Sequence, residues 1–364
     1  MRASLPLFES GKVEAIEWSF DTLYNKRNIP HWFVQLLEAF SKENRLIGHG
    51  VYFSLFSGKW TPAQEQWLVH LEKMSNHFRF DHISEHFGFM TGEDFHKGAP
   101  MNIPFTSSTL EIGKDRLKRI YNSCRCPVGL ENLAFSYSLD EVKKHGYFLD
   151  QLLEPVNGFI ILDLHNIYCQ SKNFNISSND ILELYPLERA REIHISGGSW
   201  ERSAIMPEKE IRRDTHDESV PMEVFQLLSS TIEKCKNLKF VVLEQLGTGL
   251  NSEESRIQFR DDFYKMNEII QEKNSKLNGN EIDTFLPVKP FDLRSPVEDE
   301  NLHMQQMELN RILENAPDYI SVENQLKNSS LSNSEWDIEN WDPYMVETAM
   351  RIAQKWKEGF VTRE

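Results

Sequence analysis

The segment Gly158–Leu164 is almost continuously apolar, with one carboxylate near its end. A strand of this composition is typically buried on both faces, as in a parallel sheet covered by helices. Six further segments have strand character: Val13–Phe20, Leu46–Leu55, Phe80–His86, Val128–Asn132, Arg191–Ile195 and Lys239–Glu244. The chain therefore contains seven predicted strands, and each is separated from the next by a longer stretch.

Segments with helical periodicity or helix-start signals lie between these strands. They are Ile29–Lys42, Thr61–Phe78, Ser108–Asn122, Leu139–Glu154, Ser178–Tyr185, Pro221–Lys234 and Ser252–Lys273. Regular alternation of strand and helix predicts an α/β fold, either a TIM (β/α)8-type barrel or a doubly wound sheet. A barrel needs eight strands, so we expect a first strand before Met1, where the chain opens with the helix-like segment Ala3–Glu9, or an incomplete barrel.

The composition changes after Lys273. Asn274–Asn280 is polar and typical of a linker, whereas Glu298–Asn315 and Pro343–Lys357 have helical patterns. The sequence therefore predicts a metal-dependent catalytic barrel over residues 1–273. A linker and a helical C-terminal extension are expected over residues 274–364.

Composition limits the partners and the compartment. The chain has 364 residues and a formal net charge of −16, which argues against a nucleic-acid backbone as the main partner. Its four cysteines are scattered, as expected for reduced thiols in a cytoplasmic protein. The N-terminus has no secretory pattern and no apolar run approaches 18 residues. We therefore expect a cytoplasmic protein with no membrane partner.

Polar side chains stand at or near the C-terminal ends of all seven predicted strands, where barrel enzymes carry their active sites. In chain order these residues are Glu17, His49, His86, Glu131 with Asn132, Asp163 with Asn166, His194, and Glu244. Burying so many carboxylates without cations would be very costly. The pattern therefore predicts a metal site.

A loop after the His194 strand carries two more candidate ligands. Asp214 and His216 are two residues apart, so in an extended segment both side chains point to the same side. Together with the strand ends, Glu17 left aside, they give four imidazoles and four carboxylates, more than one six-coordinate ion can use. We therefore expect more than one ion. Nitrogen and oxygen ligands without cysteine suit iron, manganese or zinc, and the residues alone do not choose among these metals.

Seven short motifs occur in one order along residues 13–270. They are His49-Gly50-Val51, Ser84-Glu85-His86, Glu131-Asn132, Leu162–Asn166, Glu192–Gly198, Asp214-Thr215-His216 and Leu243-Glu244. This order resembles the multinuclear non-haem iron-dependent oxidative enzymes, TIM-barrel proteins that include the methanobactin biosynthesis enzyme. The sequence departs from that pattern at His165, where asparagine is common. It departs again at Gln245–Gly247, where an acidic residue is common after Glu244.

The resemblance implies an iron- and O2-dependent oxidoreductase that modifies a ribosomally synthesised precursor peptide at a cysteine or an asparagine/aspartate. It implies two or three iron ions, with Mn²⁺ or Zn²⁺ as alternatives, and a separate partner protein that presents the peptide. The implied metal ligands are His49, His86, Glu131, Asp163, Asn166, His194, Asp214, His216 and Glu244.

Two other functions fit the same strand-end pattern. One is a divalent-metal TIM-barrel sugar isomerase or epimerase, or a phosphodiesterase-type hydrolase, which would turn over with manganese or zinc and without O2. The other is a non-catalytic relative with a scaffold role. His82, four residues before His86, is considered as a supporting residue without being assigned to the site.

Overall fold

A computed structural model describes residues 3–23, 29–91, 98–274 and 283–357. Its centre is a seven-stranded sheet whose strands follow one another in sequence order, and every neighbouring pair is parallel. The strands are β1 (Ile16–Trp18), β2 (Leu46–Gly50), β3 (Phe80–His86), β6 (Val128–Glu131), β7 (Phe159–Asp163), β8 (Ala190–Ile195) and β11 (Phe240–Leu243). This order is that of a wound barrel.

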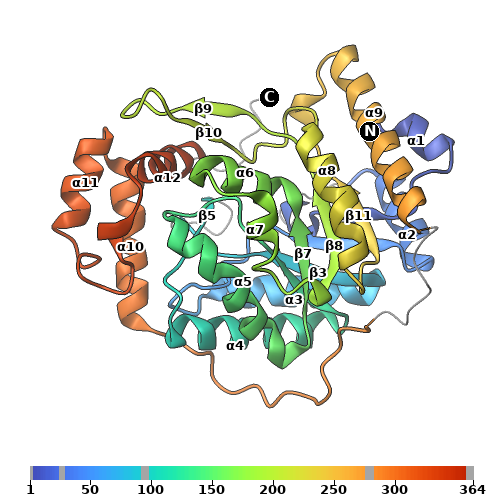
Figure 1. Ribbon diagram of the computed structural model, residues 1–364. Coiled ribbons are helices and arrows are strands. Elements are labelled where there is room, and N and C mark those ends of the chain that lie inside the picture. The colour runs from blue at the N-terminus through green and yellow to red at the C-terminus, as the bar shows by residue number, and fades with distance from the viewer. Residues whose placement is uncertain (1–2, 24–28, 92–97, 275–282, 358–364) are drawn as a thin grey trace.

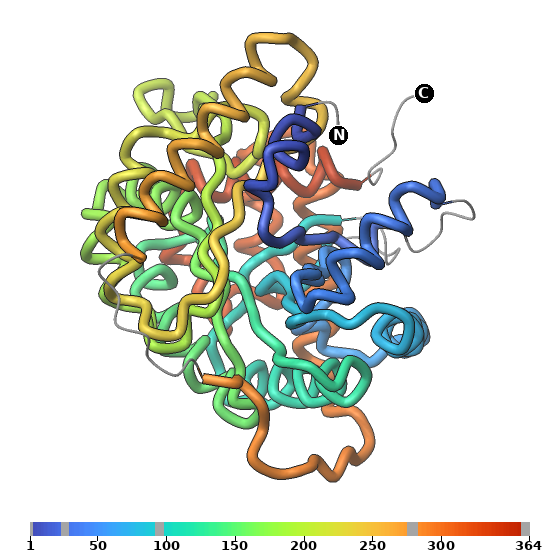
Figure 2. Tube along the Cα trace, turned by 90° about the vertical axis from the view of Figure 1, so that its right-hand side faces the viewer, coloured from blue at the N-terminus to red at the C-terminus, as the bar shows by residue number. Residues whose placement is uncertain are grey.

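Contacts between strands that are distant in the sheet show that it is rolled up. Glu17 on β1 reaches His194 on β8, with 3.2 Å between Oε2 and Nε2, although four strands lie between β1 and β8 in the order. The N-terminal helix α1 (Leu5–Glu9) lies beside α9 (Glu253–Asn274) (Figures 1 and 2), and Lys12 Nζ is 5.6 Å from the Tyr264 ring centroid. The predicted TIM-type barrel is therefore confirmed, and the described residues supply seven of its strands.

Helices cover the outside of the barrel (Figure 1). They are α2 (His31–Lys42), α3 (Pro62–His77), α4 (Ser107–Cys124), α5 (Leu139–Leu153), α6 (Leu164–Phe174), α7 (Ser178–Leu182), α8 (Met222–Thr231) and α9. Local sequence sets several of their starts: Thr61 and Thr106 each form a capping box with the residue three positions later. Apolar side chains of these helices and of the strands form one large buried cluster, which fixes the strand ends rigidly.

The structure differs from the sequence prediction in two places near the strand ends. Helix α6 was not predicted, because its first turn follows β7 directly and most of its residues are polar. Its N-cap is Asp163, whose carboxylate accepts a 2.6 Å hydrogen bond from the backbone N–H of Asn166. The segment after His86, where the sequence predicted neither strand nor helix, contains a small antiparallel pair, β4 (Phe89–Met90) and β5 (Pro100–Met101).

Three helices lie together at one side of the barrel (left in Figure 1): α10 (Glu300–Asn315), α11 (Tyr319–Lys327) and α12 (Pro343–Trp356). Sequence periodicity predicted the first and the third but not α11. Trp341 stacks on Tyr137, with 3.7 Å between ring centroids. Residues 275–282 of the predicted linker region lie outside the described part of the chain. The division at residue 273 stays a prediction.

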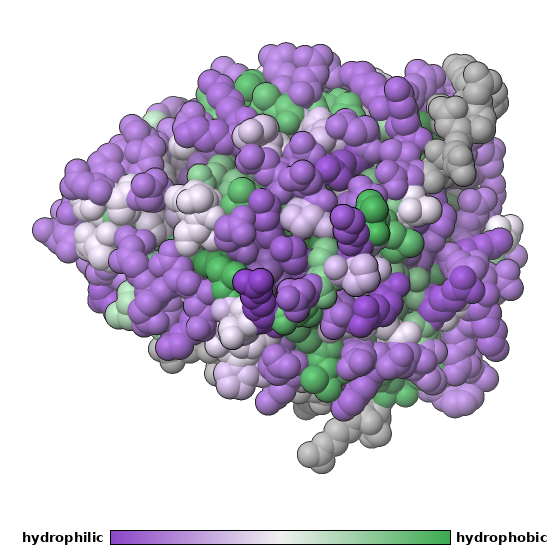
Figure 3. Space-filling model, turned by 90° about the horizontal axis from the view of Figure 1, so that it is seen from below, coloured by the Kyte–Doolittle hydropathy of each residue, from purple (hydrophilic) through white to green (hydrophobic). Residues whose placement is uncertain are grey.

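The surface seen from below is mostly hydrophilic, with apolar side chains between the polar ones (Figure 3). Across the described residues, no helix is both long and apolar enough to span a bilayer.

Candidate metal centre

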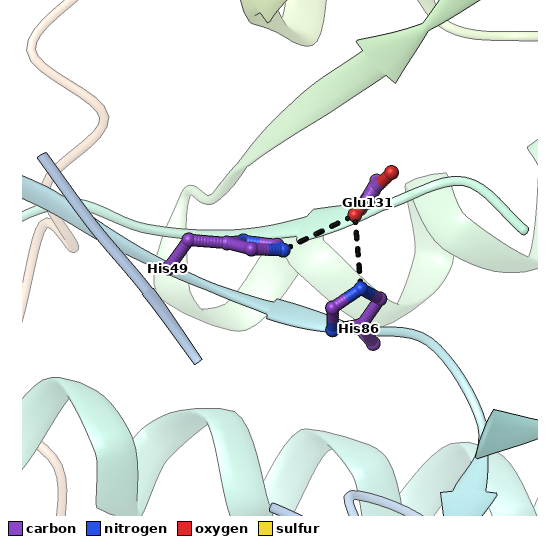
Figure 4. Close-up of side chains that lie close together, drawn as sticks. All are labelled: His49, His86 and Glu131. Carbon is purple, nitrogen blue, oxygen red and sulfur yellow. Dashed lines mark ion pairs between the residues drawn. The ribbon is translucent and has the colours of Figure 1, made fainter. Parts of the chain in front are cut away.

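Three neighbouring strands bring the first candidate group together at the mouth of the barrel. His49 is the penultimate residue of β2, before Gly50, and the register of β3 and β6 pairs His86 directly with Glu131. Nε2 of His49 is 3.3 Å and Nε2 of His86 is 3.4 Å from the same oxygen, Oε2 of Glu131 (Figure 4). Since Nδ1 of His86 lies 3.0 Å from the carbonyl oxygen of Gly50, the ring donates there. Nε2 therefore presents its lone pair toward Glu131.

A second group shares Glu131 and extends across the barrel. It joins Glu131 to Asp163 at the end of β7, His194 on β8 and Glu244 directly after β11, with ligand atoms all within 4.8 Å of one another. Nδ1 of His194 lies 3.2 Å from Oε2 of Glu244. A carboxylate shared by two groups is suited to bridge two ions.

The loop residues predicted from the Asp-x-His spacing lie next to this second group. Nε2 of His216 is 2.9 Å from Oδ1 of Asp214 and 3.7 Å from Oε2 of Glu244. The backbone of His216 is left-handed, with φ at +51°, which costs energy for a residue with a side chain. The backbone N–H of Leu246 and the amide of Gln245 both donate to the His216 carbonyl, at 2.8 and 2.9 Å. The loop is therefore held in this conformation by the segment that follows Glu244.

Asn166 is oriented by three neighbours. Its Nδ2 donates to Oε1 of Glu131 at 3.0 Å and to the carbonyl of Asn132 at 2.8 Å. Its backbone N–H is already bound to Asp163. The remaining atom, Oδ1, is buried and has no hydrogen-bond partner, as expected for an oxygen that binds a cation.

His165 supports the loop from behind. Nε of Arg212 donates to Nε2 of His165 at 3.3 Å, so the ring proton must lie on Nδ1. Nδ1 is 3.0 Å from Oδ1 of Asp214 and donates to it. The residue that departs from the family pattern therefore orients one of the predicted ligands.

Two further residues meet the centre that the predicted ligand set did not include. Oε2 of Glu17 is 3.2 Å and Oε1 of Glu192 is 3.5 Å from Nε2 of His194. Glu17 was recognised as a strand-end residue but not as a ligand. Glu192 stands two positions before His194 on β8, and this same-side spacing could have identified it. Its other oxygen, Oε2, is bound by Nε2 of His82 at 2.6 Å, so His82 does support the site.

The ionisable side chains of the centre shift one another's pKa values. Burial works against charge on His49, but nearby carboxylates, first that of Glu17, raise its pKa to about 9. Burial raises the pKa of Asp163 well above its usual value, and neighbouring carboxylates add to the shift. Burial likewise opposes ionisation of Glu244, yet His194 holds the pKa of that carboxyl well below its usual range. Without an added cation, imidazolium protons must balance the carboxylates.

Buried polar atoms without hydrogen-bond partners converge on the centre. They are Oε2 of Glu17, Oδ2 of Asp163, Oδ1 of Asn166, Oε1 of Glu192, both ring nitrogens of His194, Nε2 of His216 and Oε2 of Glu244. Each unpaired buried group costs about 1–3 kcal/mol. Cations would satisfy them together, and a set of nitrogen and oxygen donors fits divalent transition metals.

A cavity of about 450 Å³ lies at the other end of the barrel. It is lined by Asp81 and Lys239, near the starts of β3 and β11, and by Cys126 before β6. None of the predicted ligands lines it, so this cavity is separate from the candidate centre.

Comparison with known proteins gives one family match. The model of the family described as "RiPP precursor modification enzyme MbnB/TglH/ChrH" matches residues 24–247. RiPP denotes a ribosomally synthesised and post-translationally modified peptide. The matched region contains all nine predicted ligands.

Similar proteins were found by sequence and by structure. A UPF0276 protein from Acaryochloris marina is 26% identical over 54% of this chain and 69% of its own length. One from Shewanella loihica is 25% identical over 54% and 68%. A xylose isomerase-like TIM-barrel protein from Mycobacterium smegmatis, in complex with magnesium, aligns with a TM-score of 0.43 at 10% identity, over 67% of this chain and 79% of its own.

Proposed function

This chain belongs to the MbnB/TglH/ChrH family of RiPP precursor modification enzymes, and from that premise we propose that it is an iron- and O2-dependent oxidoreductase acting on a precursor peptide. The residue it oxidises would be a cysteine or an asparagine/aspartate. The observation that carries the proposal is the convergence of unpaired imidazole and carboxylate atoms at the barrel mouth.

We assign two or three iron ions to the nine predicted ligands. His49, His86 and Glu131 would hold one ion, and Glu131 would share a second with Asp163, His194 and Glu244, as the two groups of ligand atoms suggest. The remaining ligands are Asn166, Asp214 and His216. When bound, iron supplies a redox-active Lewis acid through which O2 can oxidise a peptide side chain.

The exposed side of the centre indicates where a peptide would approach. His194 is fully buried, whereas the side chains of His86 and His216 are 27% and 22% exposed. A substrate side chain would therefore meet the centre between β3 and the Asp214–His216 loop. The buried carboxylates on the opposite side would hold the cations and exclude water.

The remaining parts of the proposal concern the whole protein. Residues 1–273 would form the catalytic barrel, and residues 274–364 a linker and a helical C-terminal extension. We expect the enzyme to act in the cytoplasm on a precursor peptide that a partner protein presents.

The test is reconstitution with iron under anaerobic conditions, followed by metal analysis and Mössbauer spectroscopy. We expect at least two irons per chain, and on admission of O2 a mass change in a precursor peptide encoded near this protein. Zinc-loaded protein is the matched control and should leave the peptide unchanged. Fewer than one iron per chain would contradict the proposal. Turnover of a sugar or phosphodiester with manganese or zinc and without O2 would favour the alternative function.

A further inference from the structure

The ring of His194 faces charged groups on both of its edges. Nδ1 faces Glu244 at 3.2 Å, toward the ligands already described. Nε2 faces the other way, toward Glu17 and Glu192, at 3.2 and 3.5 Å. The side chain of Glu192 is fully buried and that of Glu17 is 9% exposed. Two carboxylates and one imidazole thus meet on the side of His194 that faces β1.

The atoms that meet there have no hydrogen bonds. Nε2 of His194, Oε2 of Glu17 and Oε1 of Glu192 are all buried and without hydrogen-bond partners. Two atoms bound to one ion at about 2.1 Å lie about 3.0 Å apart in octahedral and about 3.4 Å apart in tetrahedral geometry. The observed separations of 3.2 and 3.5 Å match such ligand pairs.

The second oxygen of Glu192 is held in the way that supports a metal ligand. Oε2 accepts from Nε2 of His82 at 2.6 Å, and Nδ1 of His82 lies 3.0 Å from Oδ1 of Asp81. Arg191 donates to that same oxygen of Asp81 at 2.8 Å. Ligating carboxylates are commonly fixed by such outer hydrogen bonds, which leave the other oxygen free for the ion.

We propose that Glu17, Glu192 and Nε2 of His194 form a further divalent-cation site, which takes a first-row transition metal such as Zn²⁺, Mn²⁺ or Fe²⁺. The site extends the proposed metal centre and rests on it, because His194 belongs to both. An ion on each side would make His194 a ligand of both, with one ring nitrogen facing each ion.

The competing arrangement has no ion at this position. In it, His194 keeps a proton on Nε2 and donates it to Glu17 or Glu192, which then only orient the ring for an ion at Nδ1. The two arrangements differ in one measurable quantity, the number of ions that depends on Glu17.

The experiment loads the full-length chain with Zn²⁺ and measures bound zinc by mass spectrometry after removal of free metal. Glu17→Gln should bind one ion fewer than the natural sequence, and the exposed control Glu14→Gln should bind the same number. Glu131→Gln should lose ions from the main centre but retain one ion that the double variant Glu17→Gln/Glu131→Gln loses. Thermal melting of the metal-free variants checks that each is folded.

Crystals of the zinc-loaded protein give a second readout that does not depend on counting. We expect an anomalous peak at the zinc edge within about 2.2 Å of Glu17, Glu192 and Nε2 of His194. If folded Glu17→Gln binds as much zinc as the natural sequence, or if no peak appears at this position, the proposal of a further site is overturned. The proposal of the main centre is unaffected by either result. Absence of zinc from the natural sequence would overturn both.

Discussion

The two sides of the metal centre are built in different ways. On one side, His49, His86 and Glu131 stand on three adjacent strands, and the sheet register itself pairs His86 with Glu131. On the other side, Asp214 and His216 stand on a loop after the hairpin of β9 (Trp200–Arg202) and β10 (Glu210–Arg212). The first side is fixed by backbone hydrogen bonds within the barrel. The second needs other restraints.

Charged side chains from the C-terminal extension provide those restraints. Glu201 on β9 binds Arg213, the residue before Asp214, and also accepts from Arg351 on α12 at 2.5 Å. Glu347 on α12 is buried and accepts from the hydroxyl of Ser203 at 2.6 Å. Helix α12, whose contacts lie 144 and 150 residues further along the chain, thus holds the hairpin that precedes the two predicted loop ligands. The loop side should therefore be the more easily disturbed of the two.

The largest effect is expected at the residue that both groups of ligands share. Glu131→Gln should weaken metal binding at least about 100-fold, the upper end of what outer-shell changes cost, because Glu131 lies in the ligand shell itself. Metal content and affinity measure this. Glu111→Gln, exposed on α4, is the control. Unchanged metal content in Glu131→Gln would show that the strand side holds no ion.

His216→Ala should affect only the loop side. We expect a loss of about one ion, because His49, His86 and Glu131 remain on their strands. Mössbauer spectra of the iron-loaded variant should lose one iron environment and keep the others. Equal iron content in the variant and the natural sequence would remove His216 from the ligand set.

Removing the contacts of Arg351 that hold the hairpin should lower metal affinity less than removing a metal ligand does. Arg351→Gln breaks the contacts to Glu201 and Glu347, which are only partly screened by solvent. It should lower the free energy of unfolding by about 1–2 kcal/mol. Metal affinity should fall less than tenfold. Arg311→Gln, whose ion pair with Glu308 on α10 is exposed, controls for charge. If both variants behave alike, the extension does not restrain the loop.

Lowering the pH should destabilise the hairpin of β9 and β10 before it destabilises β3. Burial opposes charge on Glu201, but Arg351 and Arg213 lower its pKa below 4.5. A carboxylate with a depressed pKa stabilises the fold above its unfolded value, and this contribution disappears as the pH falls through the folded value. Hydrogen exchange, corrected for intrinsic rates, should show β9 and β10 losing protection below about pH 4.5 before β3 does. Glu201→Gln should remove that difference, and simultaneous loss in both regions would argue against it.

Sequence predicted the strand side better than the loop side, for physical reasons. Strand β3 begins and ends at Phe80 and His86 as expected, because the bounds of a short strand and its terminal histidine are local features. The spacing of Asp214 and His216 identified them as a pair. It could not show the left-handed backbone of His216 or its contacts to Gln245 and Leu246, which depend on a segment 29 residues away.

Other features depended on contacts that no local pattern records. The polar helix α6 has buried residues on most of its surface, so its helical stripe is obscured. Glu192 lies inside the fully buried strand β8, where a carboxylate is interpretable only once His82 is seen beside it. The restraint by Arg351 is likewise invisible until α12 is placed against β9.

Among the described residues, the two end strands of the rolled sheet are not joined by backbone hydrogen bonds. In the described part of the chain, β1 and β11 are the two ends of the strand order and are not paired with each other. His194 nevertheless faces Glu17 of β1 on one edge and Glu244, directly after β11, on the other. Ions bound at the two ring nitrogens of His194 would link the two ends of the sheet, in place of backbone hydrogen bonds. Hydrogen exchange at β1 should then slow on metal loading, and unchanged exchange there would show that the barrel is closed by packing alone.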